Sequence, residues 1–156
     1  MVAFEPHPGN AEKLRTNVAY NDLADDVTVL ERALGDGAEV ATLHVSEAWD
    51  TMHSLVAERD GTTERVEVVP GDGVAAERGR PDVVQIDVEG AEMAALSGMV
   101  DGLRTCRTVF CEVHHDHVDE AGVRERLRAE GFEVSEVQSD DATTNLVARR
   151  ATASSP

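Results

Sequence analysis

Acidic side chains gather where a predicted strand ends and a helix begins. Residues 82–92 read DVVQIDVEGAE, and the β-branched run before the acids is typical of a parallel strand covered on both faces. Asp87, Glu89 and Glu92 follow around a turn that Gly90 permits. In open α/β sheets, ligands bind beyond the carboxyl ends of the strands, so these carboxylates are predicted to line a ligand site. For Glu92, a plain helix-start acid is an equal alternative.

A second group of titratable residues follows a later apolar strand. Glu112 lies inside that strand, and His114, His115, Asp116 and His117 follow it. Imidazole titrates near neutral pH, so His114 is a candidate base that frees a hydroxyl of its proton, and Glu112 a candidate to orient it or bind the substrate. His115, Asp116 and His117 are also metal-ligand types. Residues so close in sequence rarely converge on one ion, so we expect no metal site, and a polar loop is the alternative for His117.

The chain begins with a third junction of this kind. Residues 2–9 read VAFEPHPG, a short apolar strand that runs into Glu5 and a helix start. In nucleoside-binding folds, an acid at this point accepts hydrogen bonds from both ribose hydroxyls. The alternative is a solvated acid that the dipole of the following helix stabilises.

Four motifs together resemble the FkbM-type family of S-adenosylmethionine-dependent methyltransferases: AFEPHP at 3–8, ALG at 33–35, QIDVEGAE at 85–92 and CEVH at 111–114. The resemblance runs from residue 2 to about 147 and implies methyl transfer to a hydroxyl of a small molecule or sugar. The cofactor is a sulfonium, whose positive charge carboxylates attract. The expected cofactor-binding residues are Glu5, Ala33, Leu34, Asp87 and Glu89, with an ordinary turn as the alternative for the ALG motif. The expected catalytic residues are Asp87, Glu112 and His114.

Hydrophobic patterning predicts alternating strands and helices. The expected strands are 2–4, 27–31, 39–45, 65–69, 83–88, 108–113, 132–137 and 144–148. The expected helices are 8–20, 91–99 and 120–130, with a short helix within 71–79. This order predicts a Rossmann-like, doubly wound, mostly parallel sheet with an antiparallel edge, formed by one domain over residues 1–150. Residues 46–60 are expected to be irregular, and 151–156 to be a disordered tail.

The family's first strand and glycine-rich cofactor loop are expected before residue 2, and they are absent from these 156 residues. We therefore expect an N-terminally truncated domain with two unpaired strand edges, between strands 2–4 and 83–88. Such edges invite pairing with another chain, including a second copy. A non-catalytic remnant that binds a nucleoside or a partner protein is the alternative function. A nicotinamide-dinucleotide fragment is disfavoured, because the acidic turn has no counterpart in such a site.

The amino-acid composition indicates the environment in which the protein folds and works. The chain has 31 acidic and 14 basic residues, a net charge of −17 and one lysine, Lys13. Such a surface stays hydrated in concentrated salt, which favours a salt-accumulating halophile over an acidic protein of a GC-rich mesophile. No basic patch is present to bind nucleic acid. Cys106 and Cys111 form no zinc or disulfide pattern, and Cys111 is expected in the core. With no signal-peptide pattern and no apolar run of ~20 residues, we expect a cytoplasmic protein without membrane contact.

Overall fold

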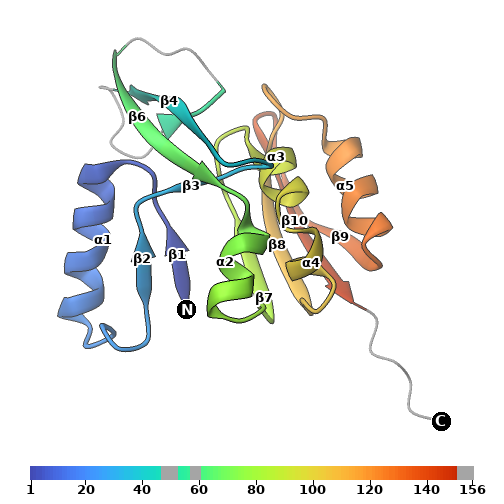
Figure 1. The fold of residues 1–156 in the computed structure, drawn as a ribbon. Helices are drawn as coiled ribbons and strands as arrows, with labels where there is room; N and C mark the ends of the chain where they lie inside the picture. Colours follow the sequence, from blue (N-terminus) through green and yellow to red (C-terminus); the bar gives the residue numbers. More distant parts are fainter. Residues whose placement is uncertain (47–52, 57–60, 151–156) are drawn as a thin grey trace.

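The computed structural model describes residues 1–46, 53–56 and 61–150 (Figure 1). The helices are α1 (Pro8–Tyr20), α2 (Gly71–Arg78), α3 (Glu92–Ser97), α4 (Val100–Leu103) and α5 (Glu120–Ala129). The strands are β1 (Val2–Phe4), β2 (Thr28–Leu30), β3 (Ala33–Leu34), β4 (Glu39–Ser46), β5 (His53–Ser54), β6 (Gly61–Val69), β7 (Val83–Ile86), β8 (Thr108–His114), β9 (Phe132–Ser139) and β10 (Thr143–Arg150). The expected disordered tail and most of the expected irregular segment 46–60 lie outside the described residues.

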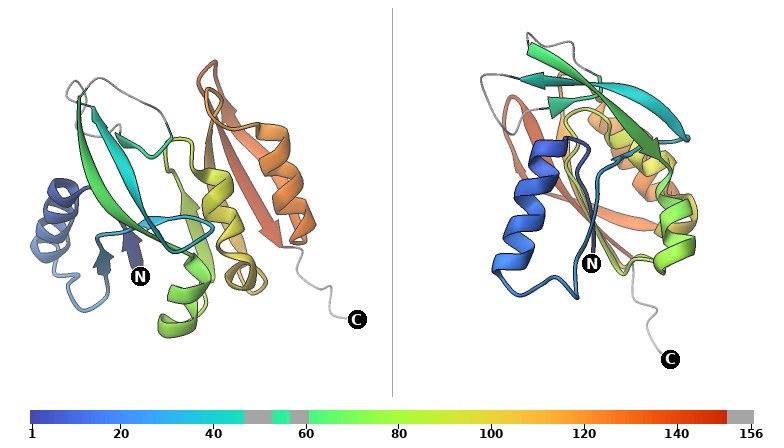
Figure 2. Two further views of the ribbon diagram at one scale, coloured as in Figure 1. Left: turned by 45° about the horizontal axis from the view of Figure 1, so that its top comes forward. Right: turned by 60° about the vertical axis from the view of Figure 1, so that its left-hand side comes forward.

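The strands pair into three sheets (Figures 1 and 2). β1 lies parallel to β2, a second sheet has the order β7-β8-β10-β9, and a third has the order β3-β6-β4-β5. In the second sheet β7 is parallel to β8, while β10 is antiparallel to both β8 and β9, which is the expected antiparallel edge. Within the described parts of the chain, β1 pairs with β2 alone and β7 with β8 alone.

One face of the second sheet carries the main hydrophobic core. Helices α3 and α5 pack on β8, and α5 also packs on β9. The buried residues between these helices and the sheet include Ile86, Leu96, Val109, Val113, Val123, Leu127 and Leu146. Their burial follows the two-residue repeat of the strands, in which alternate side chains point to opposite faces.

The expectation that this strand is covered on both faces is wrong for the chain described here. Along β7, Val84 and Ile86 are buried, but Val83 is 56% exposed and Gln85 is also exposed. The described helices that contact this sheet lie on the opposite face, where the core is. The second face of β7 therefore remains open in the described residues.

Several observed helix and strand boundaries differ from the predicted ones, because tertiary contacts override the local sequence pattern. The helix expected over 91–99 ends early, at Ser97, where Gly98 packs against the backbone of Gly35. A further short helix that was not expected, α4, follows at Val100–Leu103. A Cβ atom on Gly98 would lie 1.9 Å from the Gly35 carbonyl oxygen. β6 begins at Gly61, earlier than expected, since residues 61–68 pair with the whole of β4. The ALG motif does not form an ordinary turn, because Ala33 and Leu34 form β3 beside β6.

Candidate functional site

A strained turn after β7 places the acids of the DVEG segment. β7 ends at Ile86, and Glu89 and Gly90 both adopt positive φ angles, of 47° and 100°. A Cβ atom on Gly90 would lie 2.7 Å from Cβ of His117, so a larger residue would clash there as well as strain the backbone. A non-glycine residue with positive φ, such as Glu89, is uncommon and needs support from its surroundings.

Ser54 supports this turn. Its buried hydroxyl donates a hydrogen bond to the backbone carbonyl of Glu89 at 2.8 Å, and it accepts one from the N–H of Val56 at 3.1 Å. The third sheet is thereby attached to the turn through β5. Sequence reasoning missed Ser54, because a two-residue strand inside a polar segment gives no periodic signal.

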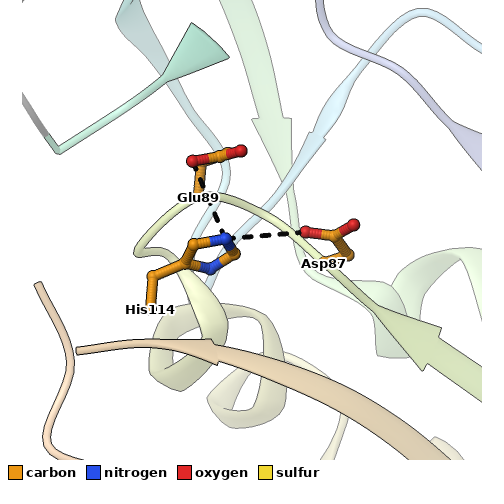
Figure 3. A group of neighbouring side chains, drawn as sticks. All are labelled: Asp87, Glu89 and His114. Atoms are coloured by element: carbon orange, nitrogen blue, oxygen red, sulfur yellow. Dashed lines mark ion pairs between the residues drawn. The ribbon is translucent and has the colours of Figure 1, made fainter. Parts of the chain in front are cut away.

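His114 brings the two sequence motifs together. It ends β8, the strand beside β7, and its Nε2 atom lies 3.9 Å from Oδ1 of Asp87 and 3.7 Å from Oε2 of Glu89 (Figure 3). The His114 side chain is 15% exposed, that of Glu89 21% and that of Asp87 49%. The ligand atoms of all three lie within 4.8 Å of one another. The structure therefore brings together Asp87, Glu89 and His114, which the sequence placed in two separate groups.

Glu92 contacts the other ring nitrogen of His114, Nδ1. It is fully buried, and its Oε1 atom lies 2.7 Å from His114 Nδ1 and accepts a hydrogen bond from the Gly90 N–H at 3.1 Å. Glu92 is the first residue of α3, as its helix-start interpretation requires, but that interpretation is incomplete. Neither sequence interpretation of Glu92 predicted that it orients His114.

The pKa values of Asp87 and His114 are both raised in this cluster. Partial burial, followed by the charge of Glu112, raises the pKa of Asp87 above its usual value. The hydrogen bond that His114 donates to Glu92 raises the pKa of His114, and partial burial opposes that shift. Three carboxylates, those of Asp87, Glu89 and Glu92, thus lie within 4 Å of one imidazole, which is an arrangement that attracts cations.

Glu112 and Asp87 line a cavity on the open face of the second sheet. The cavity measures about 330 Å³, and Phe110, Asn145 and Arg149 also contribute to its wall. Along β8, Glu112 alternates with the buried Cys111 and Val113, so it points away from the core. The expected substrate-side residue therefore faces a hollow that Asp87 also borders.

Cys111 lies in the core, as expected. Burial raises the pKa of its thiol to about 12, and burial also raises the pKa of Cys106. Neither thiol is therefore suited to nucleophilic chemistry at neutral pH.

Glu5 lies apart from this cluster, at the end of β1. Its Oε1 atom accepts a hydrogen bond from the N–H of His7 at 2.9 Å, and the His7 side chain caps α1 through the N–H of Asn10. Leu34 and Gly35 line a second cavity of about 430 Å³ together with Met93 and His117. The structure thus does not bring Glu5 or the ALG motif into direct contact with Asp87 and His114.

The loop after β8 does not gather its own histidines. His115 Nε2 lies 2.9 Å from Thr144 Oγ1 and 3.6 Å from Glu120 Oε2, which ties His115 to β10 and α5. Asp116 and His117 are exposed. Among the described residues, none of the helices is long and apolar enough to cross a membrane.

Comparison with known proteins places these features in a family. The model of the family described as "Methyltransferase FkbM domain" matches residues 1–134 of this chain. The chain is 29% identical over 118 residues to hexuronic acid methyltransferase AglP of Haloferax volcanii, covering 73% of this chain and 47% of AglP. The chain therefore spans about half the length of that relative.

A crystal structure of a methyltransferase FkbM from Methylobacillus flagellatus KT has the same fold. The TM-score is 0.64 at 15% sequence identity, over 94% of this chain and 36% of that one. This likeness confirms the expected Rossmann-like α/β fold of class I methyltransferases. With the family match covering most of the sequence, the chain belongs to the FkbM family of methyltransferases.

Proposed function

We propose that this chain forms part of an S-adenosylmethionine-dependent enzyme that methylates a hydroxyl group of a sugar. The observation that carries the proposal is the cluster of Asp87, Glu89 and His114 at the carboxyl ends of β7 and β8, with Glu92 on the other side of the imidazole. Ligands of open α/β sheets bind at this edge. Family membership supports methyl transfer as the reaction class.

The cofactor side of the site would include the end of β1 and the turn after β7. Glu5 is expected to hold the ribose hydroxyls, and Ala33 and Leu34 to border the adenine. Asp87 and Glu89 would lie between cofactor and acceptor, where their negative charge favours the sulfonium. A carboxylate that accepts two hydrogen bonds from a ribose is a strong point of recognition, since hydrogen bonds to charged groups stabilise by about 1.5–3 kcal/mol.

The acceptor side would include Glu112 and His114. In the reaction, a lone pair of the acceptor oxygen attacks the methyl carbon as the carbon–sulfur bond breaks. The electron pair of that bond passes to sulfur, which becomes a neutral thioether, and the hydroxyl proton passes to a basic group of the cluster. Because AglP is named as a hexuronic acid methyltransferase, a hexuronic acid is the first acceptor to test.

The test of cofactor binding is calorimetric titration of S-adenosylmethionine into the chain in molar KCl with a chelator present. Glu5→Gln should weaken binding about tenfold or more, the equivalent of one lost charged hydrogen bond. Glu12→Gln is the matched control, because Glu12 is an exposed acid on α1. No binding to a chain that circular dichroism shows to be folded would contradict the proposal for these 156 residues.

The test of reaction class is transfer of a radiolabelled methyl group to a hexuronic acid glycoside. Label in the sugar product supports the proposal. Binding of the cofactor without transfer to any hydroxyl acceptor would instead favour a nucleoside-binding protein without catalytic activity.

A further inference from the structure

We propose that Asp87, Glu89 and His114 together bind a divalent metal cation. The donor set is two carboxylate oxygens and one imidazole nitrogen, which suits Mn²⁺ and similar ions that accept both donor types. The sequence alone gave no reason to expect this site, because its residues come from the ends of two different strands.

The spacing of the donor atoms fits a cation after a small adjustment. Nε2 of His114 lies 3.9 Å from the Asp87 oxygen and 3.7 Å from the Glu89 oxygen (Figure 3). Ligands that each lie about 2.1 Å from one ion are roughly 3–3.4 Å apart. The Asp87 and Glu89 oxygens would each have to move toward Nε2 by less than about 1 Å to reach this spacing, and all three donor atoms already lie within 4.8 Å of one another. Asp87 is 49% exposed, so water or a substrate oxygen has access to the remaining coordination positions.

Glu92 is a second and independent observation in favour of a metal ligand. A metal-binding histidine usually donates its other ring N–H to a carboxylate or carbonyl, which fixes the ring and makes the ligand nitrogen more basic. Glu92 occupies this place, 2.7 Å from Nδ1, and is fully buried. With Nδ1 donating to Glu92, Nε2 carries the lone pair, and it lies 3.9 Å from the Asp87 oxygen and 3.7 Å from the Glu89 oxygen. In the described part of the chain, the second oxygen of Glu92 accepts no hydrogen bond.

Hydrogen bonds also support the turn that carries Glu89. Glu89 keeps its positive φ while Ser54 binds its carbonyl, and Gly90 donates to Glu92. The ligand Glu89 and the orienting residue Glu92 thus both belong to this one short segment. Supported ligands of this kind favour binding, because less conformational freedom is lost.

The role of the cation rests on the proposed function. A divalent ion next to the acceptor oxygen would lower the pKa of the hydroxyl and so assist its attack on the methyl group. His114 would then be a ligand, and the hydroxyl proton would pass to Glu112, which borders the same cavity as Asp87. This assignment replaces the role of base that the sequence suggested for His114.

The test is titration of the folded chain with MnCl₂, without S-adenosylmethionine, followed by electron paramagnetic resonance. Molar KCl is included because the net charge of −17 would otherwise attract cations without a defined site. We expect saturable binding that weakens about tenfold or more in each of Asp87→Asn, Glu89→Gln and His114→Gln. Asp116→Asn and Glu125→Gln are the controls, since both residues are exposed and lie outside the cluster, and they should bind Mn²⁺ as the unchanged chain does.

A pulsed measurement of nitrogen couplings to bound Mn²⁺ tests the histidine directly. The coupling should be present in the unchanged chain and absent in His114→Gln. The proposal is overturned if the folded chain shows no saturable binding, if the three ligand variants bind like the controls, or if no nitrogen coupling is found. Cofactor binding is measured with a chelator present, so failure of the metal site and failure of the methyltransferase proposal give separate results.

Discussion

The carboxylate of Glu92 lies 2.7 Å from Nδ1 of His114, although the two residues are 22 positions apart in the chain. This contact decides which ring nitrogen faces Asp87 and Glu89. Because Glu92 is fully buried, its charge acts on the imidazole with little screening by water. The contact thereby links the acidic turn after β7 to the end of β8.

Glu92→Gln tests this relationship with almost no change of shape. Glutamine can still accept from Nδ1–H, but it lacks the negative charge that makes the imidazole a better donor of its Nε2 lone pair. We expect methyl transfer and Mn²⁺ affinity to fall about 10–100-fold, as for other residues that orient a ligand. S-adenosylmethionine affinity in the presence of chelator should change little. Glu125→Gln, an exposed change on α5, is the control, and equal loss in both variants would argue against a specific role.

The chain segments that carry the site were predictable, but the contacts between them were not. The QIDVEGAE motif predicted a strand end with Asp87 and Glu89 at its edge, since a β-branched run followed by glycine gives a strong local signal. The pairing of Glu92 with His114 and of Ser54 with Glu89 depends on tertiary packing. The second of these joins residues 35 positions apart, and no pattern of period 2 or 3.6 encodes such a contact.

Gly98 provides a test of the packing at the end of α3. In Gly98→Ala the new Cβ atom would lie 1.9 Å from the Gly35 carbonyl oxygen, so the helix end or the segment after β3 has to move. We expect the free energy of unfolding to fall by about 3 kcal/mol, the upper part of the usual range for overpacking. Chemical denaturation monitored by circular dichroism measures the change.

Gly73→Ala is the matched control for that experiment. Gly73 lies within α2, and a Cβ atom there meets no other atom within 4 Å. Alanine favours the helix over glycine by about 0.5–1 kcal/mol, so this variant should be slightly more stable. If Gly98→Ala were as stable as Gly73→Ala, the close approach to Gly35 would be contradicted.

The contacts of Glu120 predict a pH-dependent contribution to stability. Its carboxylate binds Arg124 on the same helix and accepts a hydrogen bond from the buried Thr144 hydroxyl at 3.0 Å. The bond from Arg124 is the main cause that lowers the pKa of Glu120 below its ordinary value of 4.5. A carboxylate with a lowered pKa stabilises the folded state above the unfolded-state pKa, and this stabilisation is lost as the pH falls through the folded-state pKa.

Glu120→Gln should therefore lower the free energy of unfolding by roughly 0.5–1.5 kcal/mol at neutral pH. The difference from the unchanged chain should shrink as the pH falls below about 4.5. Denaturant unfolding across the acidic range measures both effects. Glu125→Gln on the same helix is the control. A difference that stays constant down to the acid limit would show that the charge of Glu120 is not involved.

The acidic surface predicts that salt stabilises the fold. With 31 acidic and 14 basic residues, the net charge of −17 makes the folded chain repel itself. Raising KCl from about 0.1 M to about 1 M shortens the Debye length from ~10 Å to ~3 Å and so screens this repulsion. We expect the thermal unfolding midpoint to rise over this range. An unchanged midpoint would contradict the halophilic interpretation of the composition.

A charge-reduced variant separates screening from other effects of salt. Four exposed acids on different elements are replaced by their amides: Glu12, Glu77, Glu125 and Glu133. If self-repulsion limits stability, this variant should exceed the unchanged chain in dilute buffer, and the two midpoints should converge in molar KCl, where the repulsion is already screened. If the variant were less stable in dilute buffer, these acids would stabilise the fold through local contacts, and salt would act on the chain by another route.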